Sequence, residues 1–138
     1  MNVYDFHERQ VVKVDAATEI ATLTIGAAIE VHRHLGPGLP ERSYRKAPSH
    51  EFTLRGIEHQ CEFRVPIIYK GVPVGEGKVD ILVAQRLVLE IKVVELLTPV
   101  HRAQTIAYLQ ALKLPLGLLI NFNVAILRDG IKRVLNTS

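Results

Sequence analysis

The 138-residue chain has few of the features that mark disulfide-linked, secreted or membrane proteins. It contains a single cysteine, Cys61, so no internal disulfide can form, and a reducing cytoplasm is the expected compartment. No apolar run approaches the roughly 18 residues that span a bilayer, and the first residues lack the order of a signal peptide. The sequence therefore predicts no membrane partner.

Several binding motifs are also missing. There is no glycine-rich phosphate loop, no zinc-type spacing and no run of Lys or Arg. His32 and His34 lie two residues apart and do not share a helical face, which argues against a helix-mounted metal pair. Lys and Arg number 17 against 14 Asp and Glu, a formal net charge of +3. This mild excess permits a polyanionic partner without demanding one.

The patterns that are present predict an α/β domain. A lead-in over 1–14, where 11–14 can be extended, precedes a helix over about 16–35 whose surface is mostly apolar and buried. A second helix begins near Leu39 and runs to about Leu54, and Pro48 predicts a kink or an early stop inside it. Strands are expected at 63–69, 77–83, 87–94, 116–121 and 131–135.

A third helix is expected to follow the strand over 87–94. Thr98 suits its N-cap and Pro99 its first position, and its apolar stripe is predicted to be Val100, Ala103, Ala107 and Ala111. The order of elements predicts one domain over 15–138, with a mixed sheet covered by helices on both faces.

The strand over 87–94 carries the main chemical signal. It is a nearly continuous apolar run, typical of the middle of a sheet, yet alternation places Glu90 and Lys92 on the same face. Burying two charges is costly unless they pair or bind something. A structural Glu–Lys ion pair and a functional site both satisfy this requirement.

Asp80 favours the functional interpretation. A hairpin through 84–86 would bring Asp80 close to Glu90, and two facing carboxylates repel unless a proton or a cation intervenes. Mg²⁺ prefers such oxygen ligands, and Lys92 would then face a phosphate or an attacking water. The alternative is a solvated Asp80 beside a turn. Glu41, in the first turn of the second helix, is a candidate third carboxylate, and Tyr44 is expected to face the same way.

Two polar residues of the third helix share a face. Gln104 and Tyr108 lie four residues apart, and His101 joins that side. Gln104 is expected to look toward the sheet, near Lys92 or Glu90, although a polar helix edge explains the spacing at least equally well.

Several separated motifs together resemble a known family. Residues 38–44 match the GxxExxY signature, and Asp80 followed by Glu90-Ile91-Lys92 matches the D…(D/E)xK core of the PD-(D/E)XK nuclease superfamily. Segments 28–38, 97–101 and 117–122 are also similar to the small GxxExxY proteins. The resemblance covers about 18–136. Val79 stands where the superfamily pattern has proline, and Pro48 interrupts a helix expected to be continuous.

The resemblance implies a restriction-endonuclease-like fold with its active site on the central sheet. It implies metal ligation by Asp80, Glu90, the carbonyl of Ile91 and Glu41, with Lys92 as the catalytic lysine. Gln104 and Tyr108 resemble a QxxxY helix motif, so Gln104 joins the implied catalytic set. The supporting residues are Tyr44, Tyr108 and His32.

The implied activity is Mg²⁺-dependent hydrolysis of phosphodiester bonds in nucleic acid, with DNA as the expected substrate and Mn²⁺ as a substitute metal. Two other functions remain open. One is a catalytically silent nucleic-acid-binding or assembly module of the same fold, and the other is hydrolysis of a different phosphoester, such as a nucleotide. The sequence also leaves a homodimer open.

Overall fold

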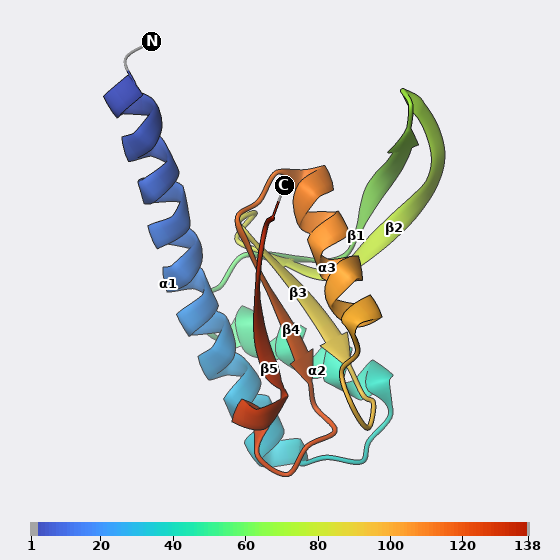
Figure 1. The fold of residues 1–138 in the computed structure, drawn as a ribbon. Coiled ribbons are helices and arrows are strands. Elements are labelled where there is room, and N and C mark those ends of the chain that lie inside the picture. Colours follow the sequence, from blue (N-terminus) through green and yellow to red (C-terminus); the bar gives the residue numbers. More distant parts are fainter. Residues whose placement is uncertain (1–2, 138) are drawn as a thin grey trace.

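The computed structural model describes residues 3–137, with side chains from residue 16 onward. Two helices come first, α1 (Val3–Leu35) and α2 (Glu41–Leu54), followed by the strands β1 (His59–Tyr69), β2 (Val72–Val83) and β3 (Leu87–Lys92). Helix α3 (Pro99–Leu112), β4 (Leu116–Asn121), the short 3₁₀ helix η1 (Leu127–Gly130) and β5 (Ile131–Leu135) complete the chain (Figure 1).

The strands form one mixed sheet in the order β1-β2-β3-β4-β5. Only β3 and β4 run parallel, and α3 makes the crossover between them. The other neighbours are antiparallel. The predicted hairpin between β2 and β3 is confirmed, with Ile81 opposite Leu89 and Val83 opposite Leu87.

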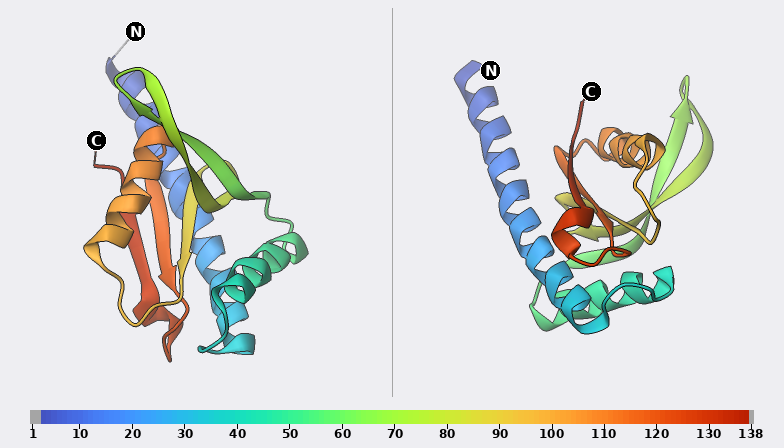
Figure 2. Two further views of the ribbon diagram at one scale, coloured as in Figure 1. Left: turned by 90° about the vertical axis from the view of Figure 1, so that its right-hand side faces the viewer. Right: turned by 60° about the horizontal axis from the view of Figure 1, so that its bottom comes forward.

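Helices cover both faces of the sheet, as predicted for an α/β fold of restriction-endonuclease-like type (Figure 2). On one face α1 and α2 pack on Leu87, Leu89 and Ile91 of β3 in the larger apolar core. On the other face α3 packs on a smaller core that includes Val88 and Leu119. Alternate residues of β3 therefore serve different layers.

Helix α1 begins much earlier than predicted. It starts at Val3, so the extended conformation suggested for 11–14 is wrong. The expectation that most of its surface is buried also fails, because Leu23 and Ile29 are each 46% exposed. The buried residues of its described part form one stripe at helical spacing, Ala17, Ala21, Thr24, Ala27, Ala28, Val31 and His32.

Helix α2 continues through Pro48 to Leu54, so the expected early stop is wrong. Proline inside a helix removes one backbone hydrogen bond, which costs about 3 kcal/mol. Pro48 is buried between Tyr44 and Phe52, also buried, on the face that meets the sheet. Burial of this apolar ring offsets the lost hydrogen bond.

Helix α3 begins at Pro99 with Thr98 as its N-cap, as predicted, but its predicted apolar stripe is wrong. Val100 is 75% exposed, and the three alanines of that stripe are exposed as well. Thr105 and Leu109 are buried instead, and Ile106, Tyr108 and Leu112 pack beside them. The larger side chains bury more apolar area than alanine, so they decide which face meets the sheet.

The outer part of the β1–β2 hairpin extends beyond the other strands (Figure 1 and Figure 2). Its apolar side chains are exposed there, among them Ile68 (55%) and Tyr69 (62%). Across the described residues, no helix combines the length and apolar character needed to cross a membrane.

Candidate active site

The candidate site lies where β2 separates from β3. The two strands pair only from Ile81 to Val83, and the β1–β2 hairpin continues past Asp80 without β3. The backbone N–H of Ile91 then has no strand partner in β2, and a buried N–H needs an acceptor. Asp80 Oδ2 accepts from this N–H at 2.8 Å.

Glu90 makes the reciprocal contact. The backbone N–H of Asp80 donates to Glu90 Oε1 at 3.3 Å, so each strand supplies a carboxylate to the backbone of the other. Glu90 is 2% exposed, whereas Asp80 is half-buried. The predicted proximity of Asp80 and Glu90 is confirmed, and the alternative of a solvated Asp80 is wrong.

Burial and the neighbouring Asp80 raise the pKa of Glu90 to about 9. Loss of hydration is the larger cause, because the ionised carboxylate cannot be solvated inside the sheet. Repulsion from Asp80 adds to it, while Lys92 acts in the opposite direction. Near neutral pH, Glu90 therefore holds a proton unless another cation replaces it. Two adjacent carboxylates of this kind fit an oxygen-preferring divalent cation.

Lys92 is held by α3 rather than by Glu90. Its Nζ donates to Gln104 Oε1 at 3.1 Å, and Gln104 Nε2 lies 3.5 Å from the hydroxyl of Tyr108. The expected proximity of Gln104 to Lys92 is confirmed. His101 instead caps its own helix, because its Nδ1 accepts from the backbone N–H of Thr98 at 3.0 Å.

Glu41 does not join the carboxylate pair directly. Its Oε2 lies 2.9 Å from Nη2 of Arg45, and Arg45 Nε lies 3.5 Å from Asp80 Oδ1. No group of three or more His, Cys, Asp or Glu in the described part of the chain is arranged to hold a metal ion. The predicted convergence of three carboxylates on one point is therefore wrong. The guanidinium of Arg45 supplies the positive charge between Glu41 and Asp80.

Tyr44 and His32 occupy structural positions. Tyr44 is fully buried, and its hydroxyl donates to the carbonyl of Gly36 and accepts from the N–H of Leu39. It does not face the same way as Glu41, because its ring stacks on Phe122 at 4.9 Å. The Nε2 of His32 lies 2.8 Å from the carbonyl oxygen of Val124, which ties α1 to the loop after β4.

Sequence reasoning missed two further residues near the site. Arg45 follows Glu41 by four residues on one helix, a spacing that favours an ion pair and was open to prediction. Asn121 is a polar residue at the end of an apolar strand, and it pairs with Lys92 in the parallel ladder. Its side chain bonds both the N–H (3.1 Å) and the carbonyl (2.8 Å) of Val94, which fixes the chain just after β3.

Gly77 was also missed. A Cβ atom at this position would clash with the ring of Tyr108, so that ring rests directly on the backbone of β2. The sequence offers no signal for this contact beyond the glycine itself. The contact joins α3 to the strand that carries Asp80.

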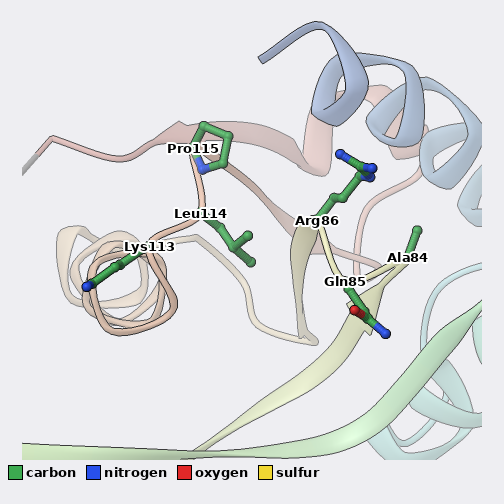
Figure 3. Close-up of a pocket in the computed structure, with 6 residues that line it drawn as sticks. All are labelled: Ala84, Gln85, Arg86, Lys113, Leu114 and Pro115. Atoms are coloured by element: carbon green, nitrogen blue, oxygen red, sulfur yellow. The ribbon is translucent and has the colours of Figure 1, made fainter. Parts of the chain in front are cut away.

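A cavity of about 250 Å³ lies at the other end of the β2–β3 hairpin (Figure 3). It is lined by the turn residues Ala84, Gln85 and Arg86 and by Lys113, Leu114 and Pro115. The charged ends of Arg86 and Lys113 point away from one another in Figure 3, so they do not form a common anion site. Asp80, Glu90 and Lys92 do not line this cavity.

The chain is similar to a known protein family. The family model described as the PD-(D/E)XK nuclease superfamily matches residues 18–134, a range that contains Glu41, Asp80, Glu90, Lys92 and Gln104. No curated protein and no solved structure matches the chain. The family match covers most of the sequence and includes every element of the sheet. The chain belongs to the PD-(D/E)XK nuclease superfamily.

Proposed function

We propose that this protein is a metal-dependent nuclease that hydrolyses phosphodiester bonds of nucleic acid, with DNA as the expected substrate. The observation that carries the proposal is the contact between Asp80 and Glu90, beside Lys92, in a chain of this superfamily. The match of residues 38–44 to the GxxExxY pattern supports a place among the GxxExxY proteins.

Asp80 and Glu90 would hold the metal ion together with the backbone carbonyl of Ile91. Glu41 becomes available only when Arg45 releases it, because the guanidinium now binds both Glu41 and Asp80. Such an all-oxygen set suits Mg²⁺, and Mn²⁺ accepts the same ligands. A cation bound there lowers the pKa of a coordinated water and neutralises charge on the scissile phosphate.

Lys92 and α3 perform the remaining chemistry in this proposal. Lys92 orients or deprotonates the attacking water, or neutralises the charge that develops on the phosphate. Gln104 directs the ammonium group through its hydrogen bond, and Tyr108 supports Gln104. Tyr44 and His32 support the site from a distance, since they fix the loops at the ends of α1 and β4.

One observation favours a second candidate, a catalytically silent nucleic-acid-binding module. Arg45 bridges Glu41 and Asp80 at 2.9 and 3.5 Å and so compensates the charge of Asp80 without any metal ion. A protein that had lost catalysis could retain the fold in this way. The complete set of Asp80, Glu90 and Lys92 nevertheless favours activity, because burying Glu90 beside a second carboxylate costs stability that apolar residues would not.

A cleavage panel separates the two candidates. Wild type and Asp80→Asn, purified identically, are incubated with single-stranded DNA, duplex DNA and RNA in Mg²⁺, in Mn²⁺ and in EDTA. We expect wild type to cleave DNA only with metal and Asp80→Asn to be inactive yet folded. Equal cleavage by both proteins would point to a contaminant, and no cleavage by wild type under any condition would support the silent module.

A further inference from the structure

A cleft of about 720 Å³ opens beside Asp80 and runs along α2. The helix forms one wall with Arg42, Arg45, Lys46 and His50, and the strands β1 and β2 form the other, which includes Glu62 and Asp80. Arg45 contacts Asp80, so the first turns of α2 mark the end of the cleft at the candidate site. The volume falls in the range of about 300–1,000 Å³ that is usual for ligand sites.

The acidic side chains of the cleft have ion-pair partners, whereas two of its basic side chains do not. Asp80 is paired with Arg45 at 3.5 Å, and Glu62 faces Lys78 at 3.9 Å. Within the part of the chain that the structure describes, the exposed side chains of Arg42 and Lys46 have neither a hydrogen bond nor an ion pair. Both acidic groups thus have internal partners, and these two cations remain available to an anion from solution.

Three residues of the helix wall, the two available cations and His50, lie along one line. Arg42, Lys46 and His50 are spaced by four residues, so they share one face of α2 and lie about 6 Å apart along its axis. Phosphates of a nucleic-acid strand repeat at about 3.4 Å along the duplex axis. A nucleic-acid strand that lies along α2 can therefore place a phosphate beside each of these side chains, with one or two nucleotides between successive contacts.

The lining also indicates which part of a nucleic acid is bound. No Phe, Tyr or Trp lines the cleft among the described residues, so the small ring of His50 is the one aromatic surface that it offers to a base. Arginine and lysine contacts recognise the phosphate backbone and carry little sequence information.

We propose that this cleft holds the phosphodiester backbone on one side of the scissile bond, with Arg42 and Lys46 as the phosphate-binding residues. The inference rests on the proposed nuclease function for the position of the scissile bond at Asp80. It assigns the strand a path from Asp80 along α2 toward its last turn. Binding along this path is independent of base sequence.

The test measures binding without cleavage. Fluorescein-labelled oligonucleotides of two unrelated sequences, as single-stranded DNA, duplex DNA and RNA, are titrated in EDTA at several salt concentrations. Fluorescence anisotropy compares wild type with Arg42→Ala/Lys46→Ala. The matched control is Lys132→Ala/Arg133→Ala, which removes the same charge from exposed positions on β5, at the other edge of the sheet. Circular dichroism confirms that both variants are folded.

We expect the cleft variant to bind about tenfold more weakly at low salt and the control to stay near wild type. Two lost phosphate contacts should lower the magnitude of the slope of log K against log salt by about 1.4 for single strands and 1.8 for duplex DNA. An unchanged slope in the cleft variant, or equal losses in both variants, would overturn the proposed path.

Cleavage in Mg²⁺ or Mn²⁺ is measured separately on the same proteins. A wild type that binds through the cleft but cleaves nothing contradicts the nuclease proposal and supports the backbone-binding cleft. If wild type cleaves but Arg42→Ala/Lys46→Ala binds as tightly as wild type, the proposed binding path along the cleft is contradicted and the nuclease proposal is not.

Discussion

The two faces of β3 are built from alternate residues of one short strand, yet they differ in kind. Leu87, Leu89 and Ile91 enter a continuous apolar core against α1 and α2. On the opposite face Val88 is apolar, whereas Glu90 accepts a hydrogen bond from the backbone of Asp80 and Lys92 donates one to Gln104 of α3. The apolar face packs the sheet against α1 and α2, and the polar face places charged groups where they are poorly solvated.

The geometry of the strands offsets the free-energy cost of burying these charged groups. Because β2 leaves β3 at Asp80, backbone N–H groups of both strands are free to bond carboxylates. Had the ladder continued, the N–H of Ile91 would have bonded the backbone of β2 instead. The site thus depends on the early end of the β2–β3 pairing as much as on the identities of its residues.

The largest expected effect of a single change on the polar face belongs to Lys92→Ala. We expect cleavage to fall about 10³-fold, because the variant loses the cation proposed to act on the attacking water or the phosphate. The free energy of unfolding should change by less than about 1 kcal/mol, since Lys92 is half-buried and bonds only to an exposed Gln104.

Single-turnover cleavage and urea denaturation measure these two effects. Metal binding, followed by isothermal titration calorimetry, should persist in Lys92→Ala because no oxygen ligand is removed. Loss of metal binding together with activity would mean that Lys92 shapes the ligand set, and the contrast between the two faces would weaken.

The apolar face should respond in the opposite way. Leu89 is 1% exposed within the larger core, and Leu89→Ala should lower the free energy of unfolding by about 2–5 kcal/mol through lost burial and a residual cavity. Urea denaturation tests this prediction, with Leu96→Ala as a control because Leu96 is 76% exposed. At temperatures where the variant remains folded, cleavage should stay within a few fold of wild type. If folded Leu89→Ala is as inactive as Lys92→Ala, the two faces do not separate into one that determines stability and one that determines activity.

The third prediction concerns pH. Glu90 titrates near 4.5 in the unfolded chain and at about 9 in the folded protein without metal. Between these values the folded state keeps a proton that the unfolded state releases, so the free energy of unfolding falls as pH rises through this window. The loss should amount to a few kcal/mol at most and should shrink when Mg²⁺ replaces the proton.

Urea denaturation in EDTA at pH 6 and pH 8.5 measures the effect. Glu90→Gln should remove most of the difference, because it cannot ionise. Asp80→Asn should reduce it, since it removes the charge that repels the ionised form of Glu90. A pH dependence that is unchanged in Glu90→Gln would assign the titration to another group.

Local patterns were enough to predict the central parts of the site. Alternation along 87–94 and a short turn at 84–86 placed Asp80 beside Glu90, and the four-residue spacing of Gln104 and Tyr108 directed Gln104 toward Lys92 or Glu90. These relations depend on neighbouring residues and on the fixed periods of strands and helices. The first turn of α2, with Glu41 in it, followed from the same kind of reasoning.

Features that depend on competition between side chains were not predictable in this way. The stripe of Val100 and three alanines is regular, but Leu109 and its neighbours bury more area and face the sheet instead. Pro48 remains helical because its ring is buried against the sheet. Arg45 reaches Asp80 across two elements, and only the packed structure determines which carboxylates it bridges.

The smallest expected effect separates positioning from chemistry on α3. Gln104 accepts a hydrogen bond from Lys92, whereas Gln110 is an exposed residue of the same helix with no side-chain hydrogen bond in the described structure. Gln104→Ala should lower cleavage about tenfold, which corresponds to loss of one partly solvated, charge-assisted hydrogen bond. Gln110→Ala should cleave as wild type does, and both variants should unfold within about 0.5 kcal/mol of it.

A double-mutant comparison distinguishes this positioning role from general damage to the helix. Because Gln104 contacts the ammonium group of Lys92, Gln104→Ala should lower cleavage when Lys92 is present and have no further effect in Lys92→Ala. A merely structural defect would lower activity by the same factor in both backgrounds. If Gln104→Ala and Gln110→Ala cleave equally well, the hydrogen bond between Lys92 and Gln104 does not contribute to catalysis.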